Sequence, residues 1–195
     1  MQRDDQLRAF VAVGGNLGDR LATLRSAVHM LGHDHPAELR VVGVSPIYET
    51  RPIGPSVEPF FNAVVELRTR CAPRVVLDRL LAIEVRHGRQ RGRRWDARTL
   101  DLDLLLMLRP TPPGWVALTV REDGLQLPHP GLAQRDFVLV PLADLVGDEP
   151  VVDGRSPASW LAALAEGERT ILRRVDEGLD GGELREGAQP GCGTP

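Results

Sequence analysis

Apolar residues follow two patterns along the chain: short runs that predict strands, and longer stretches with helical spacing. Between residues 19 and 32, the apolar side chains from Leu21 to Leu31 share one helical face. Asp19 is in the first turn and Gly32 follows the last apolar residue. A second helix is expected from Pro73 to Gly88, because proline is favoured at the first helical position and glycine just beyond the last. The predicted strands are 7–13, 39–44, 61–67 and 99–108, with a loop at 45–60.

The order strand-helix-strand-strand-helix-strand predicts an α+β fold, a ferredoxin-like α/β sandwich with a mostly antiparallel sheet. Both early helices are expected on one face of the sheet, and helices from the C-terminal part on the other. Ser156 and Pro157 are typical of a helix start, and residues 116–120 are typical of an edge strand. Residues 6–175 are expected to form one domain, followed by a disordered Gly-rich tail at 176–195.

The predicted strand at residues 99–108 carries the main chemical signal. Because side chains alternate between the faces of a strand, one face is expected to be core and the other to present two carboxylates. The core face consists of Leu100, Leu102, Leu104, Leu106 and Leu108, and the other face of Asp101, Asp103, Leu105 and Met107. Two aspartates at this spacing either form a solvated face or share divalent cations. Mg²⁺ fits them best, because it is commonly held by one or two carboxylates together with phosphates and water.

Composition narrows the chemistry further. All 24 basic residues are arginines, and the absence of lysine excludes P-loop, protein-kinase and Schiff-base mechanisms. The 195 residues carry a net charge of −3 and are 42% hydrophobic, which is ordinary for soluble globular proteins. Cys71 and Cys192 are too few for a disulfide framework or a zinc site, and no apolar stretch suits a membrane span or a signal peptide. We therefore expect a cytoplasmic protein that does not bind membranes.

An arginine-rich segment comes directly before the strand with the two aspartates. Six arginines fall between residues 86 and 98. Such a run is most often a solvated or nucleic-acid-binding surface, but guanidinium groups also suit polyphosphate oxygens. Gly88 and Gly92 would let the segment move as a lid. A nucleic-acid-binding module therefore stays open beside a phosphate-transfer enzyme, although the net negative charge and the lack of exposed aromatic pairs argue against nucleic acid.

The most distinctive part of the chain is RWDARTLDLDLLL, with GRQR before it and LPHP and RDFVLVPL after it. It is preceded, in order, by VAVGGNLGDRLATL, YETRPIGP, FFNAVVEL and IEVRHGR. Together these motifs resemble the 6-hydroxymethyl-7,8-dihydropterin pyrophosphokinases of folate biosynthesis, from about Phe10 to Trp160. The resemblance implies a ferredoxin-like fold and transfer of the β,γ-pyrophosphoryl group of ATP to the hydroxymethyl group of the reduced pterin, with release of AMP. It also implies two Mg²⁺ ions.

The resemblance further implies roles for residues at matching positions. The catalytic residues would be Arg89, Arg98, Asp101 and Asp103, with the two aspartates holding both metal ions. The nucleotide-binding residues would be Glu84, Arg91, Trp95, His129 and Arg135. The pterin-binding residues would be Gly14, Thr50, Pro52, Ile53, Phe60, Asn62 and Phe137, with Phe137 stacked on the ring. Arg51 stands where the family usually has proline or a small residue. The expected partners are small molecules, ATP and the reduced pterin, and the chain is expected to be a monomer.

Overall fold

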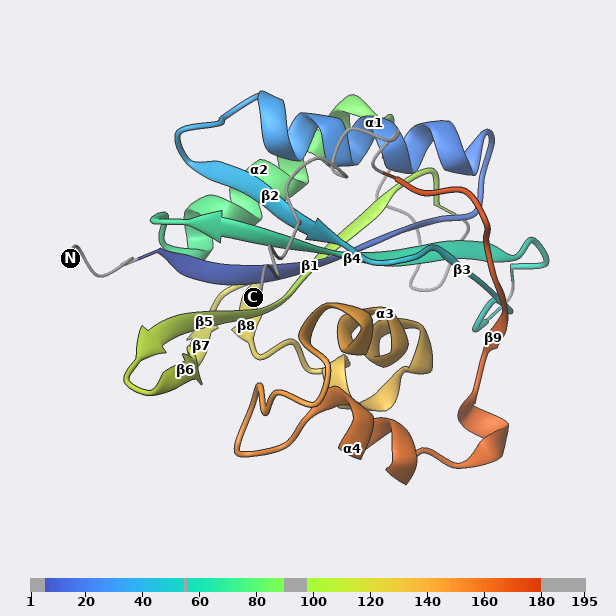
Figure 1. Cartoon of the computed structure of the whole chain (residues 1–195). Helices are drawn as coiled ribbons and strands as arrows, with labels where there is room; N and C mark the ends of the chain where they lie inside the picture. The colour runs from blue at the N-terminus through green and yellow to red at the C-terminus, as the bar shows by residue number, and fades with distance from the viewer. Residues whose placement is uncertain (1–5, 55, 90–97, 180–195) are drawn as a thin grey trace, which may run out of the picture.

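The computed structural model describes residues 6–54, 56–89 and 98–179, with an antiparallel sheet of seven strands at its centre (Figure 1). The strand order is β6-β5-β1-β4-β3-β9, and β2 pairs with β4 along the same edge as β3. The strands are β1 (Leu7–Gly15), β2 (Leu39–Val44), β3 (Tyr48–Thr50), β4 (Phe60–Thr69), β5 (Asp101–Thr111), β6 (Gly114–Ala117) and β9 (Ile171–Arg174). A separate two-stranded sheet is formed by β7 (Val120–Glu122) and β8 (Leu125–Leu127).

Helices cover both faces of the sheet. On one face lie α1 (Arg20–His33) and α2 (Pro73–Arg86), and on the other lie α3 (Asp136–Val146) and α4 (Pro157–Ala163) (Figure 1). The strands β5-β1-β4-β2 with α1 and α2 form the strand-helix-strand-strand-helix-strand unit that the sequence predicts. The ferredoxin-like α+β sandwich is therefore confirmed. In the described part of the chain, no helix is both long and apolar enough to cross a membrane.

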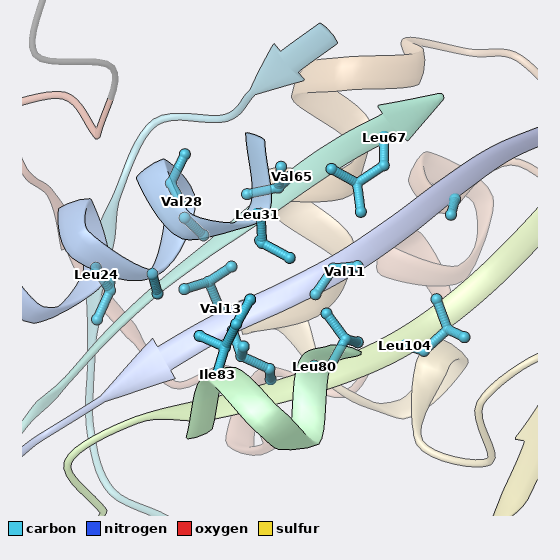
Figure 2. Packing of buried hydrophobic residues seen from close by; sticks show 14 of the residues in the cluster. Val11, Val13, Leu24, Val28, Leu31, Val65, Leu67, Leu80, Ile83 and Leu104 are labelled. Atoms are coloured by element: carbon cyan, nitrogen blue, oxygen red, sulfur yellow. The ribbon is translucent and has the colours of Figure 1, made fainter. Parts of the chain in front are cut away.

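The first core layer lies between α1, α2 and the sheet. Leu24, Val28 and Leu31 recur along one face of α1, as their spacing predicts, and pack over Val11 and Val13 of β1 (Figure 2). The helix begins one residue later than predicted, because Asp19 is its N-cap rather than part of the first turn, and its carboxylate accepts a hydrogen bond from the Ala22 amide.

The end of α1 differs slightly from the prediction. Gly32 lies inside the helix, which ends at His33. A Cβ on Gly32 would lie 3.4 Å from Cγ2 of Val41, an ordinary van der Waals contact, so this glycine neither ends the helix nor is required by its packing on β2.

The loop predicted at residues 45–60 contains a strand that the sequence analysis missed. In β3, Tyr48 pairs with Asn62 and Thr50 pairs with Phe60 of β4. Three residues between two prolines are too short for strand alternation to be recognised in the sequence. The omission matters, because this strand places Thr50 in the pocket described below.

The prediction of which β5 side chains lie on each face of the sheet is correct only for the first half of the strand. The register between β1 and β5 shifts so that Phe10 pairs with Leu106 but Val11 pairs with Leu104, which leaves Leu105 as the extra residue of a β-bulge. Leu100, Leu102 and Leu104 pack on the side of α1 and α2, as predicted, and Met107 joins them. Leu106 and Leu108 pack on the side of α3 instead. The prediction for Leu106, Leu108 and Met107 was therefore wrong, because one extra residue reverses the alternation beyond it.

The C-terminal part of the chain returns to the sheet. Ser156 caps α4 as predicted, and β9 then pairs with β3 at the edge of the sheet. The described residues end at Leu179, which is 4% exposed and packs in the core on the α1 side. Residues 180–195, which make up most of the expected tail, lie outside the described part of the chain.

Candidate active site

A pocket of about 480 Å³ opens on the face of the sheet that α3 covers. Its walls are the end of β1, the strand β3 with the residues after it, the starts of β4, β5 and α3, and the loop between β8 and α3. Residues far apart in the sequence therefore meet here, including both aspartates of β5.

Two rows of residues cross the floor of the pocket. In the first, Gly14 of β1 lies between Asn62 of β4 and Asp101 of β5. In the second, Ala12 pairs with Asp103. Cross-strand partners share one face of the sheet, so an amide and two carboxylates border the same space. A side chain on Gly14 would enter that space, because its Cβ would lie 2.7 Å from Asn62 Oδ1.

The Asn62 amide is held by the neighbouring strand. Its Nδ2 donates a hydrogen bond of 2.8 Å to Oγ1 of Thr50, a residue that is 1% exposed. With the amino group used in this way, Oδ1 remains as an acceptor beside Gly14. The pocket thus presents a fixed acceptor on its β4 side.

Asp101 is the centre of a cluster of opposite charges at the other side of the floor. Arg98 Nη1 lies 2.7 Å from Oδ2, and Arg89 Nη1 lies 2.8 Å from Oδ1. Oδ1 nevertheless accepts no hydrogen bond of good geometry from the described residues, although it is buried. Both guanidinium groups are only about a quarter exposed, so they have already lost much of their hydration, and Arg98 lines the pocket.

Asp103 lies in a less favourable setting. Burial, and then the negative charge of Asp101, raise the pKa of Asp103 above its ordinary value, against smaller opposing effects of nearby His129, Arg135 and Arg89. The two carboxylates border one space, and the negative charge of Asp103 is unfavourable there. Because a divalent cation would compensate this charge, the pair is a suitable donor set for one. No three His, Cys, Asp or Glu side chains gather as metal ligands among the described residues. A cation here would therefore complete its shell with water or substrate oxygens, as Mg²⁺ commonly does.

Glu84 is a buried carboxylate that contacts both β5 and Arg89. Its side chain is 2% exposed and Oε1 accepts a hydrogen bond of 2.7 Å from the Leu102 amide of β5. The same oxygen is ion-paired with Arg89, whose own amide donates to the Glu84 carbonyl. Glu84 therefore links α2, the start of β5 and Arg89, and it does not line the pocket itself.

The loop after β8 supplies an imidazole and a guanidinium. The His129 amide donates a 2.7 Å hydrogen bond to the carbonyl of Leu105, the bulged residue of β5. Burial lowers the pKa of His129 although the charge of Asp103 acts in the opposite direction. The ring is thus neutral near pH 7, and because Nδ1 accepts the Gly131 amide (3.1 Å), Nε2 carries the proton. A Cβ on Gly131 would lie 2.8 Å from the Arg135 guanidinium carbon, so this glycine makes room for Arg135.

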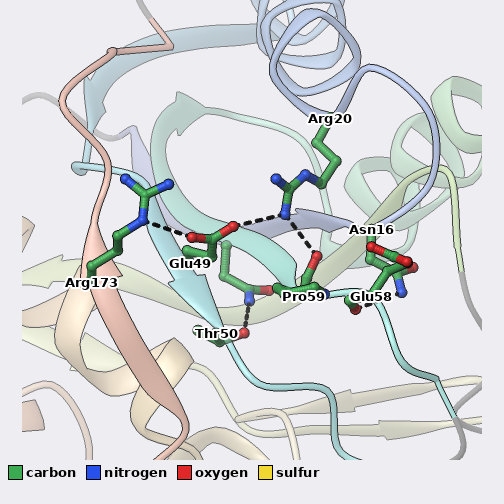
Figure 3. A network of polar contacts seen from close by, with 8 residues as sticks. Asn16, Arg20, Glu49, Thr50, Glu58, Pro59 and Arg173 are labelled. Carbon is green, nitrogen blue, oxygen red and sulfur yellow. Dashed lines mark hydrogen bonds and ion pairs between the residues drawn. The ribbon is translucent and has the colours of Figure 1, made fainter.

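Asn16 connects Arg98 with the loop between β3 and β4, a role that the sequence analysis missed. Its Nδ2 donates to Ser56 Oγ (2.7 Å) and to the carbonyl of Glu58 (3.1 Å), close to where Arg20 holds the carbonyl of Pro59 (Figure 3). Its Oδ1 accepts the Arg98 amide at 2.8 Å. The side-chain contacts of Asn16 are with residues about 40 and 80 positions away, so they leave no local pattern in the sequence.

The structure brings most of the predicted site residues together. Those that line the pocket on the expected pterin side are Gly14, Thr50, Ile53, Phe60, Asn62 and Phe137, and those on the expected phosphate side are Arg98, Asp101, Asp103, His129 and Arg135. Pro52, Glu84 and Arg89 do not line it, although Arg89 contacts Asp101. Arg91 and Trp95 lie outside the described residues. Arg51, Gln134 and Val138 also line the pocket without having been predicted to do so.

Comparisons with known proteins show which family the chain resembles over most of its length. Residues 10–147 match the family model described as 7,8-dihydro-6-hydroxymethylpterin-pyrophosphokinase (HPPK). A Pseudomonas aeruginosa protein named 2-amino-4-hydroxy-6-hydroxymethyldihydropteridine pyrophosphokinase is 41% identical over 157 residues, which cover 80% of this chain and 91% of that protein. Proteins of the same name from Bacillus subtilis and Synechocystis are 41% identical over 138 residues (70% of this chain, 77% of theirs) and 36% identical over 177 residues (90% and 85%).

Proposed function

The chain belongs to the 7,8-dihydro-6-hydroxymethylpterin-pyrophosphokinase family, and we propose that the pocket beside β5 is where it transfers the pyrophosphoryl group of ATP to the hydroxymethyl group of the reduced pterin. The observation that carries the proposal is the floor of the pocket. An amide acceptor at Asn62 and two carboxylates at Asp101 and Asp103 border one space, with Gly14 leaving room between them. No finding supports the nucleic-acid alternative.

The pterin is assigned to the side of β3 and β4. Asn62 Oδ1 is oriented by Thr50 and would accept hydrogen bonds from the N–H groups of the pterin edge. Phe137 offers a ring face on the opposite wall, where stacking on a flat heterocycle is favourable. The hydroxymethyl group would then point along the floor toward the carboxylates of β5.

The ATP phosphates are assigned to the side of β5 and the loop after β8. Arg98 and Arg89 would exchange part of their contact with Asp101 for phosphate oxygens, and Arg135 would add a third guanidinium. Neutral His129 would donate from Nε2, because its Nδ1 is already used. Asp101 and Asp103 would hold Mg²⁺, two ions as the resemblance implies, which would neutralise the charge on the bound phosphates.

In this reaction the residues would position the substrates and stabilise charge, and none of them would form a covalent intermediate. The hydroxymethyl oxygen attacks the β-phosphorus, its bond to phosphorus forms as the bond to the AMP oxygen breaks, and AMP leaves. Arg89 and Arg98 would stabilise the charge that grows on the phosphate oxygens in the transition state. A lysine is not required, which fits the composition of the chain. We further propose that the chain acts in the cytoplasm as a monomer.

The test is nucleotide product analysis with ATP, Mg²⁺ and the reduced 6-hydroxymethyl pterin. Pyrophosphoryl transfer gives AMP, whereas ADP would indicate transfer of a single phosphoryl group and would refute the proposal. The matched control is a reduced 6-methyl pterin, which fills the same pocket but lacks the nucleophilic hydroxyl and should release no AMP. A second arm compares melting temperatures, where a Mg-ATP analogue should stabilise the protein and RNA should not.

A further inference from the structure

Asp136 is a buried carboxylate at the start of α3 for which the reaction has no use. It is 2% exposed and lies between Arg135 and Phe137, both of which line the pocket. Its Oδ1 accepts hydrogen bonds from Thr170 Oγ1 (2.6 Å) and from the Phe137 amide (2.8 Å). Its Oδ2 accepts the amides of Thr170 and Ile171, the latter at 2.9 Å. Four donors thus meet a single buried side chain, and three of them come from residues about 34 positions away.

The same C-terminal segment also holds the opposite wall of the pocket. The Arg51 amide donates to the Thr170 carbonyl at 2.9 Å, and the Arg51 guanidinium donates to the Arg169 carbonyl. Ile171 pairs with Thr50 where β9 joins β3. Thr50 and Arg51 line the pocket, so residues 169–171 contact its β3 wall and its α3 wall at once.

The residue at the N-cap of α3 adds no side-chain hydrogen bond to the first turn beside those of Asp136. The N-cap position is occupied by Arg135, whose side chain makes no capping hydrogen bond. The bonds between Asp136 and residues 169–171 therefore tie the first turn of α3 to β3, while the bond from Tyr48 to Asp144 ties the last part of the helix to the same strand. Removing one donor from a buried carboxylate leaves part of its charge unsatisfied, which favours movement of this turn.

We propose that Asp136 is a positioning residue that, through residues 169–171, sets the width of the pocket between β3 and α3 and so sets the affinity for the pterin. This inference rests on the proposed function, because it concerns the same pocket. Asp136 contacts no reacting atom in this scheme. It acts through Phe137 on one side of the ring and through Thr50 on the other.

The experiment compares Thr170→Val with Thr170→Ser, since valine keeps the shape but loses the hydroxyl, whereas serine retains it. Asp136→Asn tests the other end of the contact. Thr69→Val is the matched control, because Thr69 is also a buried threonine whose hydroxyl donates a 2.6 Å hydrogen bond, here to the Glu38 carbonyl, and it does not line the pocket. Steady-state AMP release is measured well below each melting temperature, with the pterin and ATP varied separately.

Thr170→Val and Asp136→Asn should raise the KM for the pterin about 10-fold, the effect of losing one hydrogen bond to a charged group, while kcat changes much less. Thr170→Ser and Thr69→Val should keep the wild-type KM, even where their melting temperatures fall. If Asp136→Asn does not fold, the two Thr170 variants decide the question. Equal KM values for all Thr170 variants in an active wild-type background would overturn the positioning role alone. A wild-type chain that releases no AMP would instead refute the proposed function and the inference with it.

Discussion

Asp103→Asn should raise the thermal stability of the protein in EDTA, whereas Asp101→Asn should lower it. The two aspartates are two positions apart on β5, so their Cα atoms are about 6.5–7 Å apart. At an effective dielectric constant of about 20, unit charges at this distance repel by about 2.5 kcal/mol. Arg135 and Arg89 offset much of this, and we expect a net gain of about 1 kcal/mol for Asp103→Asn, or about 2–4 °C at this chain length.

The opposite sign at Asp101 follows from its two ion pairs. Asp101→Asn weakens contacts of 2.7 and 2.8 Å with Arg98 and Arg89 at a site that is only about a quarter exposed. A loss between the exposed and buried limits for ion pairs, about 1–2 kcal/mol, is expected. Both variants should lose the stabilisation that Mg²⁺ and an ATP analogue give to the wild type, because each removes a proposed metal ligand.

The assay is thermal unfolding of the wild type and both variants, in EDTA and with Mg²⁺ plus the analogue. The pH dependence provides an internal check. Because the folded-state pKa of Asp103 is raised, its ionisation costs stability above that pKa, and the cost disappears below the ordinary aspartate range. The advantage of Asp103→Asn should therefore shrink as the pH falls through this interval. A lower melting temperature for Asp103→Asn in EDTA at pH 7, or an equal gain for Asp101→Asn, would refute the electrostatic reasoning.

Three further predictions concern the rest of the site and the C-terminus. Arg98→Ala and Arg89→Ala should lower kcat much more than they weaken ATP binding, as comparison of turnover with analogue titration would reveal; a loss of affinity alone would assign them to docking. Gly14→Ala should raise the KM for the pterin about 10-fold or more by displacing Asn62, with ATP binding retained as the control. Deleting residues 181–195 should leave the melting temperature and AMP release unchanged, and a large drop in the melting temperature would contradict this.

The sequence predicted those parts of the structure that depend on local periodicity. The apolar face of α1 follows from the spacing of Leu24, Val28 and Leu31. The shared face of Asp101 and Asp103 follows from strand alternation, which holds from the start of β5 to Leu104. The ordered motifs then brought together residues from β1, β3, β4 and α3 that no local pattern relates. For this reason the resemblance located more of the pocket than periodicity did.

The features that the sequence could not give are set by contacts between distant segments. The bulge at Leu105 reflects a mismatch between β1 and β5, and nothing in a run of leucines marks the extra residue. Asn16 and Asp136 each bond to residues at least 34 positions away, so neither role has a sequence signature. Even so, the bulge has a consequence at the site, because the Leu105 carbonyl accepts the His129 amide.

The charged groups near the two ends of β1 differ in how fully other groups of the protein compensate their charge, and this difference distinguishes a structural cluster from a binding site. At its first end, Arg8 is 7% exposed, yet it donates to Glu66 and Glu149 at 2.8 Å each and lies 5.3 Å from the Trp115 ring centre. Every partner of that cation lies within the fold, so the cluster requires nothing further. At the other end, Asp101 Oδ1 lies 2.8 Å from Arg89 Nη1 but accepts no hydrogen bond of good geometry within the described part of the chain, and burial raises the pKa of Asp103. Electrostatic imbalance of this kind is costly to keep in a folded chain, and it is expected where bound charges complete the site. A cation at the two carboxylates would remove the cost of ionising Asp103 and would complete this end of the sheet.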